Sequence, residues 1–146
     1  MILFDTNVLV YAINADAPQH RTCRDLVEGV QARQVDGVLV PQVLLEFYAI
    51  VTDPRRVARP LDPTNARTQV EALRTIFPVR DAGSKALDHL HDLLKDGKTT
   101  GGDVFDAFLV AQMRACNISA ICTCNIRDFA RFGGIMVYSP EDLARR

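Results

Sequence analysis

The stretch MILFDTN, residues 1–7, decides how the rest of the chain is interpreted: three apolar residues run directly into Asp5, Thr6 and Asn7. A short apolar run of this kind is typical of a strand that is buried on both faces in a parallel sheet. The sequence Asp-Thr-Asn favours a turn or a helix cap. We therefore expect Asp5 at the end of the first strand, where open α/β folds bind their ligands. The alternative is that one of these three residues only caps a helix, and the stretch alone leaves both interpretations open.

Length and composition indicate a folded globular protein. The 146 residues, 48% of them hydrophobic, fit one domain over residues 1–146 with a sizeable core. No apolar run reaches the ~18–20 residues that span a membrane, and residues 1–12 lack the basic segment and cleavage site of a signal peptide. We expect a soluble, cytoplasmic protein that does not enter a membrane.

The charges are balanced overall but unevenly distributed. A net charge of −1 lacks the basic excess that indicates nucleic-acid binding, although it does not exclude such binding. The most basic segment carries Arg55, Arg56 and Arg59 between two prolines. An arginine cluster suits contacts to RNA phosphates, and the alternative is a solvated connection between helices.

Hydrophobic periodicity along the chain predicts alternating strands and helices. We expect helices from His20, over Pro41–Val51, from Pro63, over Gly83–Lys95, from Asp103 to about Cys116, and after Ser139. We expect further strands at Val38–Val40, Ser119–Thr123 and Ile135–Tyr138, with a short edge strand at Phe77–Val79. This order predicts an α/β fold with a central, mostly parallel sheet of four to five strands flanked by helices.

Two acidic residues lie in unexpectedly apolar surroundings. Glu46 follows Pro41 in a helix, and its neighbours three and four positions away include no base. Asp106 lies in the first turn of the helix that begins at Asp103, among almost exclusively apolar residues. A capping role explains Asp103 well, whereas Asp106 needs another partner. For Glu46, exposure to solvent is the simpler alternative.

The predicted topology brings these acids together. Asp5 ends the first strand, Glu46 and Asp106 lie in later helices, and Asn125 and Asp128 follow a later strand. All of them can converge at one edge of a parallel sheet, where carboxylates without bases repel one another unless a cation neutralises them. Oxygen ligands suit Mg²⁺ or Mn²⁺, ions that activate water and stabilise the leaving oxygen in phosphodiester hydrolysis.

The ordered set of motifs resembles the PIN domain. The motifs are Asp5-Thr6-Asn7 after an apolar strand, LLEF at residues 44–47, DAFLVA at residues 106–111 and TCNIRDF at residues 123–129. More narrowly, the chain is similar over essentially its whole length to VapC toxins of type II toxin–antitoxin pairs. The resemblance implies a metal-dependent endoribonuclease that acts on RNA, is often a homodimer and is held inactive by a cognate antitoxin. It also implies metal-ligand roles for Asp5, Glu46 and Asp106, and supporting roles for Thr6, Asn7 and Thr123.

One position departs from the family's pattern. The fourth acid of the family usually stands second after the strand-ending threonine, where this chain has Asn125. An asparagine can bind Mg²⁺ through its carbonyl oxygen but brings no charge, whereas Asp128 brings a charge and lies three residues further on. We expect Asp128 to complete the metal site, and Asp103 is the remaining acid that could contribute.

Three other functions fit parts of the pattern. A phosphatase of the haloacid dehalogenase type also has an aspartate at the end of its first strand, but it needs a second acid where Asn7 stands. A phospho-acceptor receiver domain has a similar acidic pocket, but it opens with adjacent acids. A catalytically weak PIN-like module that only binds RNA or protein would be consistent with Asn125.

Overall fold

A parallel sheet forms the centre of this computed structural model, which describes residues 1–146. Its strands are β1 (Ile2–Phe4), β2 (Gly37–Val38), β3 (Ala120–Cys122) and β4 (Met136–Tyr138), in the order β2-β1-β3-β4, and every neighbouring pair is parallel. The strand β1 pairs with β2 through Ile2 and Gly37, and with β3 through Leu3 and Ile121. The first strand therefore lies inside the sheet, and its residues Leu3 and Phe4 are inaccessible to solvent, as its uninterrupted apolar sequence predicts.

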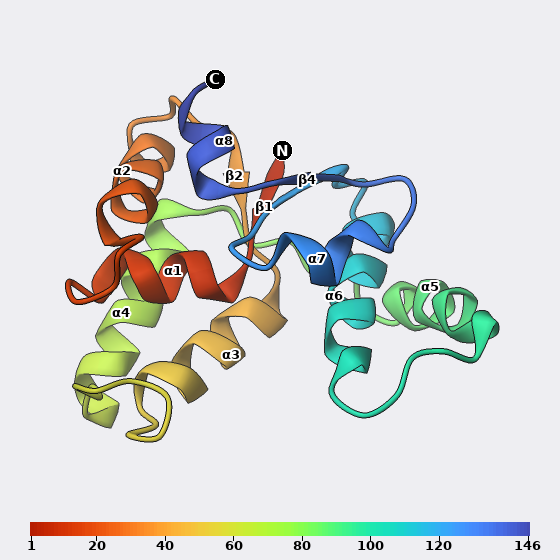
Figure 1. Cartoon of the computed structure of the whole chain (residues 1–146), viewed down its shortest axis with the longest axis horizontal. Coiled ribbons are helices and arrows are strands. Elements are labelled where there is room, and N and C mark those ends of the chain that lie inside the picture. The colour runs from red at the N-terminus through yellow and green to blue at the C-terminus, as the bar shows by residue number, and fades with distance from the viewer.

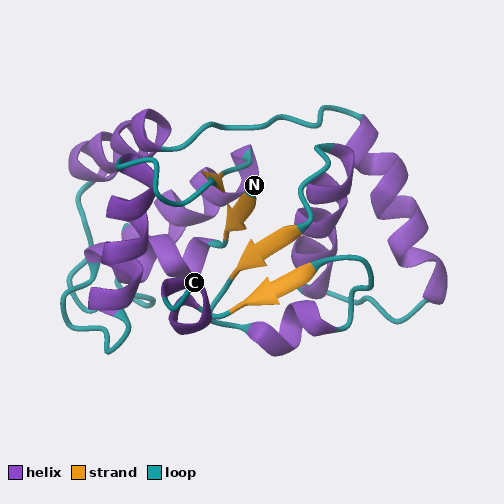
Figure 2. Cartoon of the chain, turned by 90° about the horizontal axis from the view of Figure 1, so that it is seen from above, coloured by secondary structure: helices purple, strands orange, loops and turns teal.

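Helices cover both sides of this sheet (Figures 1 and 2). In Figure 1, α1 to α4 lie on one side of the strands, and α5 and α6 lie on the other, where they pack against each other. No helix is long and apolar enough to cross a membrane. The helix bounds are α1 Thr6–Ile13, α2 His20–Gln31, α3 Pro41–Val51, α4 Pro63–Ile76, α5 Lys85–Leu93, the short 3-10 helix η1 Leu94–Asp96, α6 Asp103–Ala115, α7 Ile126–Ala130 and α8 Pro140–Ala144.

A continuous hydrophobic core joins the two sides of the sheet. It contains Leu3 and Ile121 from adjacent strands, Val8 from α1, Phe47 from α3 and Met113 from α6, all of them inaccessible to solvent. Burial of apolar surface on this scale supplies most of the stability of the fold. It also fixes the ends of the strands relative to the helices that start beside them, which is the condition for a rigid site there.

The structure confirms the predicted α/β fold with a parallel sheet and corrects three local predictions. The sequence predicts no helix before His20, whereas α1 begins directly after β1 with Asp5 as its cap, and the Asp5 carboxylate accepts a hydrogen bond from the Thr6 N–H. The edge strand predicted at Phe77–Val79 is reduced to a single parallel bridge between Leu39 and Val79. The short helix α7 follows β3, where the sequence predicts only a polar strand end.

Close packing around β2 depends on Gly37. A Cβ atom at this position would lie 2.6 Å from Val30 Cγ2 and 2.9 Å from Phe77 Cε1, and both neighbours belong to the core. We expect Gly37→Ala to lower the free energy of unfolding by about 1–3 kcal/mol, since overpacking shifts buried side chains. Gly133→Ala is the matched control, because its Cβ would meet nothing within 4 Å. Urea denaturation of both variants measures the difference, and equal stabilities would contradict the packing argument.

Candidate functional site

Asp5 lies at the carboxyl end of β1 and is almost completely buried. Its Oδ1 accepts a hydrogen bond from the Thr6 backbone N–H at 2.7 Å. Its Oδ2 accepts from Thr123 Oγ1 at 2.6 Å and from Asn7 Nδ2 at 2.9 Å. Asp5 therefore caps α1 with one oxygen and is anchored to the end of β3 with the other. It is both a strand-end residue and a helix cap, the two positions that the sequence left open.

Thr123 and Asn7 fasten the end of β3 to the start of α1. The Thr123 side chain is inaccessible to solvent, and its hydroxyl donates to Asp5 while accepting from the Asn125 backbone N–H at 3.0 Å. Asn7 Oδ1 accepts from the Cys124 backbone N–H at 3.1 Å. Every buried polar side-chain atom in the structure has a hydrogen-bond partner, and this network contributes to that result at the point where two strands end.

Glu46 reaches the same region from the middle of α3. Its Oε2 accepts a hydrogen bond from Thr6 Oγ1 at 3.0 Å, and its Oε1 accepts from Gln42 Nε2 at 2.7 Å. Glu46 is half-buried and forms no ion pair. The carboxylate is thus directed by neutral donors, which orient it without neutralising its charge.

Asp106 and Asp128 complete the group of carboxylates from the first turns of α6 and α7. The pKa of Asp106 is raised from its ordinary 3.8 to about 6, first by burial and then by the charges of Asp128, Asp5 and Glu46, whereas Arg131 acts in the opposite direction. Each of these acids therefore affects the ionisation of Asp106. Asp106 is half-buried, and Asp128 is exposed.

Burial also raises the pKa of Asp5, and the charge of Glu46 acts in the same direction. The hydrogen bonds from Thr123, Thr6 and Asn7 oppose this rise, since they favour the ionised carboxylate. The protein thus holds two acids where ionisation is costly and provides Arg131 as a nearby cation. Such perturbed carboxylates are typical of functional sites that receive a positive charge from a ligand.

Two other predicted residues, Asp103 and Asn125, form no side-chain hydrogen bond to these carboxylates. Asp103 is the first residue of α6 and is exposed, and its backbone carbonyl accepts a hydrogen bond from Arg131 Nη2 at 3.4 Å. Asn125 precedes α7, is exposed and makes no side-chain cap bond there. Its backbone N–H, bound to Thr123, is its contact with the network around Asp5.

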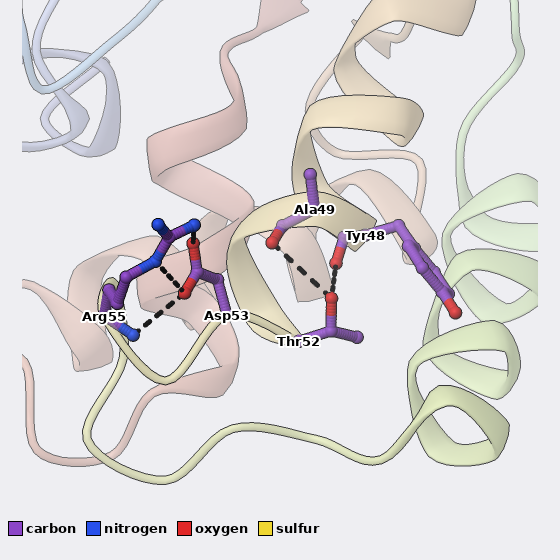
Figure 3. Close-up of polar contacts among 5 residues, drawn as sticks. All are labelled: Tyr48, Ala49, Thr52, Asp53 and Arg55. Carbon is purple, nitrogen blue, oxygen red and sulfur yellow. Dashed lines mark hydrogen bonds and ion pairs between the residues drawn. The ribbon is translucent and has the colours of Figure 1, made fainter.

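The predicted RNA-binding arginines lie in the loop that follows α3. This loop is at the end of the helix that points away from the strand ends (Figure 1). Arg55 bends back onto Asp53 in a two-pronged ion pair with nitrogen–oxygen distances of 3.0 Å (Figure 3). Arg59 is paired with Asp16 at 2.7 Å, and Arg56 forms no ion pair. The three arginines are therefore not part of the carboxylate group, and two of them already have acidic partners.

Three residues of the site were not identified from the sequence. Gln42 is one helical turn before Glu46 and binds it, and Gln112 binds Gln42 in turn at 2.7 Å. Arg131 lies beyond α7 and stacks on the Phe132 ring at 4.5 Å. The spacing of four between Gln42 and Glu46 was the available signal for the first, while the other two depend on the tertiary fold.

The donor set at the strand ends fits a divalent cation. Asp5, Glu46 and Asp106 offer only oxygen atoms, and repulsion among them is relieved by a positive charge. No three His, Cys, Asp or Glu side chains converge into a closed metal-binding group. A small hard cation that retains several water ligands needs only one or two direct carboxylates, so an open arrangement of this kind is compatible with it.

Comparisons with known proteins agree with this geometry. The family model described as PIN domain matches residues 2–135. Ribonuclease VapC48 of Mycobacterium tuberculosis is 33% identical over 139 residues, which cover 94% of this chain and 95% of the relative. Ribonuclease VapC24 of the same species is 28% identical over 144 residues, 96% of this chain and 97% of the relative. The crystal structure of DNA-bound VapBC from Salmonella typhimurium contains a chain with a TM-score of 0.68 and 19% identity, covering 96% of this chain and 99% of that one. These matches confirm the resemblance predicted from the four motifs.

The raised pKa of Asp106 generates a prediction about stability. Because its folded-state pKa lies above its ordinary value, the stability associated with this carboxyl is fully present below about pH 4 and is lost as the pH rises through about 6. Metal-free Asp106→Asn should therefore unfold at a higher temperature than the parent at pH 7.5. We expect a gain of about 1 kcal/mol, after allowance for solvent screening of a half-exposed carboxylate. The gain should vanish near pH 4, as followed by thermal unfolding in chelator.

Asp88→Asn is the matched control for this measurement. Asp88 is also an acid in the first turn of a helix, α5, but it is exposed. We expect no pH-dependent gain from its replacement. If the advantage of Asp106→Asn were equally large at pH 4 and pH 7.5, it would arise from packing and not from ionisation.

Proposed function

The chain belongs to the PIN-domain family, and we propose that it is a metal-dependent endoribonuclease of the VapC type, the toxin of a toxin–antitoxin pair. The observation that carries this proposal is the group of carboxylates at the strand ends, where burial raises the pKa values of Asp5 and Asp106. The relatives that bear the name ribonuclease support the same activity. Membership of the family sets aside the phosphatase and receiver-domain alternatives.

We propose that Asp5, Glu46 and Asp106 hold the cation, and that the cation is Mg²⁺ or Mn²⁺. An all-oxygen donor set favours these ions over softer metals. When bound, the cation would activate a water molecule and stabilise the leaving oxygen of the phosphodiester. The protein's part is to hold Asp5 with three donors and Glu46 with two, so that neither carboxylate must be ordered when the cation arrives.

Asp128 is our choice for the fourth acid of the site. Its charge is the next cause, after burial, of the raised pKa of Asp106, which supports a position facing that carboxylate. Asn125 carries no charge, and its backbone is already bound to Thr123. Asp103 begins α6 with an exposed side chain, and we assign it only a supporting role at the start of that helix.

For the RNA contact, Arg56 is the strongest candidate of the three loop arginines. Arg55 and Arg59 are paired with Asp53 and Asp16, whereas Arg56 is free to bind a phosphate. Exposed ion pairs are weak, so the other two arginines can also exchange their partners for phosphate at little cost. Because the loop follows α3, an RNA that reaches it would extend from the strand ends along this helix.

A protein antitoxin and a second copy of the chain are the proposed partners. Several solved relatives of this fold are VapBC complexes, and in two of them the complex is bound to DNA. By analogy, we propose that this chain is inhibited by an antitoxin of its own and forms a homodimer. RNA as the substrate implies action in the cytoplasm, and we propose that residues 1–146 act as one domain.

Cleavage of RNA by Asp106→Asn tests the proposal directly. Asp106 forms none of the side-chain hydrogen bonds that hold Asp5 and Glu46, so its replacement removes charge without breaking the network. We expect at least a ~100-fold loss of Mn²⁺- or Mg²⁺-dependent cleavage of total RNA, the scale of a lost transition-state contact. Asp5→Asn is a less clean test, because an amide cannot accept all three of the hydrogen bonds that Asp5 receives.

The controls separate the proposal from its alternative. Asp88→Asn should cleave like the parent, and chelator should abolish cleavage by both. Cleavage by Asp106→Asn at the parental rate would rule out the proposed site. If the parent protein binds RNA but does not cleave it in Mn²⁺, the result would favour the alternative that is consistent with Asn125, a catalytically weak PIN-like module.

Replacement of Arg56 tests the proposed RNA contact. If Arg56 binds one phosphate, Arg56→Ala should weaken binding of single-stranded RNA and reduce the slope of log K against log salt by about 0.7. Arg21→Ala on α2 is the matched exposed control and should leave the slope unchanged. Binding is measured in chelator, where cleavage is blocked, by titration at several salt concentrations. An unchanged slope for Arg56→Ala would contradict the RNA contact and favour the alternative, in which the loop is only a solvated connection between helices.

A further inference from the structure

We propose that two glutamines, Gln112 and Gln42, act in series as positioning residues that hold Glu46 ready for the cation. The inference rests on the proposed function, since it concerns the same metal site. Gln112 donates to Gln42 Oε1 at 2.7 Å, and Gln42 donates from Nε2 to Glu46 Oε1 at 2.7 Å. The two amides thus form a chain of hydrogen bonds that ends on the carboxylate.

The burial of Gln112 supports a functional role for this series of hydrogen bonds. Gln112 is 5% exposed, and the other buried polar or charged side chains are Asp5, Thr6 and Thr123, all of which belong to the site. A buried amide costs stability unless it is hydrogen-bonded, and an apolar residue would fill the same space without that requirement. Its position on α6, the helix that carries Asp106, places it beside Gln42 on α3.

Backbone carbonyls fix the direction of both amides. Gln112 Nε2 also donates to the Phe108 carbonyl at 3.4 Å, and Gln42 Nε2 also donates to the Phe105 carbonyl at 3.0 Å. A carbonyl oxygen can only accept, so a reversed amide at either position would set oxygen against oxygen. Gln42 must therefore present its N–H groups, and not its oxygen, to Glu46.

The consequence is a link between two ligand-bearing helices. Glu46 on α3 is tied through Gln42 to the first turns of α6, where Asp106 lies. Thr6 Oγ1 holds the second carboxylate oxygen from α1. Glu46 is thereby oriented by neutral donors on both oxygens, and no cationic side chain forms an ion pair with it.

The test measures Mn²⁺ binding to the RNA-free protein by isothermal titration calorimetry. Variants are Gln42→Leu, Gln112→Leu and the double variant, and Gln69→Leu on α4 is the control glutamine outside the site. Loss of a residue that orients a metal ligand typically weakens binding about 10–100-fold, and we expect about tenfold for each single variant. Because the two amides act in series, the double variant should bind about as weakly as Gln42→Leu alone.

The outcomes discriminate between the proposed positioning of Glu46 by the two glutamines and a merely structural role for them. Parental Mn²⁺ affinity in Gln42→Leu would overturn the inference, and so would losses that multiply in the double variant, because independent effects would then be at work. Gln42 is half-buried, so its replacement keeps the test valid even if Gln112→Leu fails to fold. Failure of the proposed function would be distinguishable, since the parent itself would then bind no Mn²⁺.

Discussion

The hydrogen bond between Thr123 Oγ1 and Asp5 Oδ2, at 2.6 Å, is the interaction on which the site depends. It joins the ends of β1 and β3, two strands that are adjacent in the sheet although 118 residues separate the partners in sequence. Asp5 also caps α1 through Thr6, and Thr6 in turn holds Glu46. One buried carboxylate therefore sets the relative positions of two strands and two helices, and the remaining acids are arranged around it.

This arrangement works against the stability of the protein on its own. Carboxylates placed where burial raises their pKa values remain there only because the surrounding core determines the backbone. Arg131 offsets part of the negative potential at Asp106, and the donors to Asp5 and Glu46 are neutral. The fold thus supplies orientation and leaves most of the charge uncompensated, which is the state that a divalent cation can exploit.

Sequence patterns predicted the parallel sheet, α3, α6 and the acids that converge at the strand ends, because apolar periodicity and strand-end polarity are local signals. They did not predict that α1 starts at Thr6, since a capping aspartate and a turn have similar sequences. The role of Gln112 has no local signal, because its bond to Gln42 links residues 70 positions apart. Charge predicts that Asp128 completes the site, whereas its effect on the pKa of Asp106 depends on α7, a helix that the sequence does not predict.

The order of the strands has a consequence for biosynthesis. Because β1 lies between β2 and β3, it can pair with β2 early in synthesis but lacks its second neighbour until residues 120–122 have been translated. Pairings between such distant segments form late in folding, after the cost of closing a long loop has been met. Thr123, which anchors Asp5, is also made after most of the chain. The pairing of β1 with β3, and with it the anchoring of Asp5 by Thr123, is therefore completed only after the long segment between the two strands has been made.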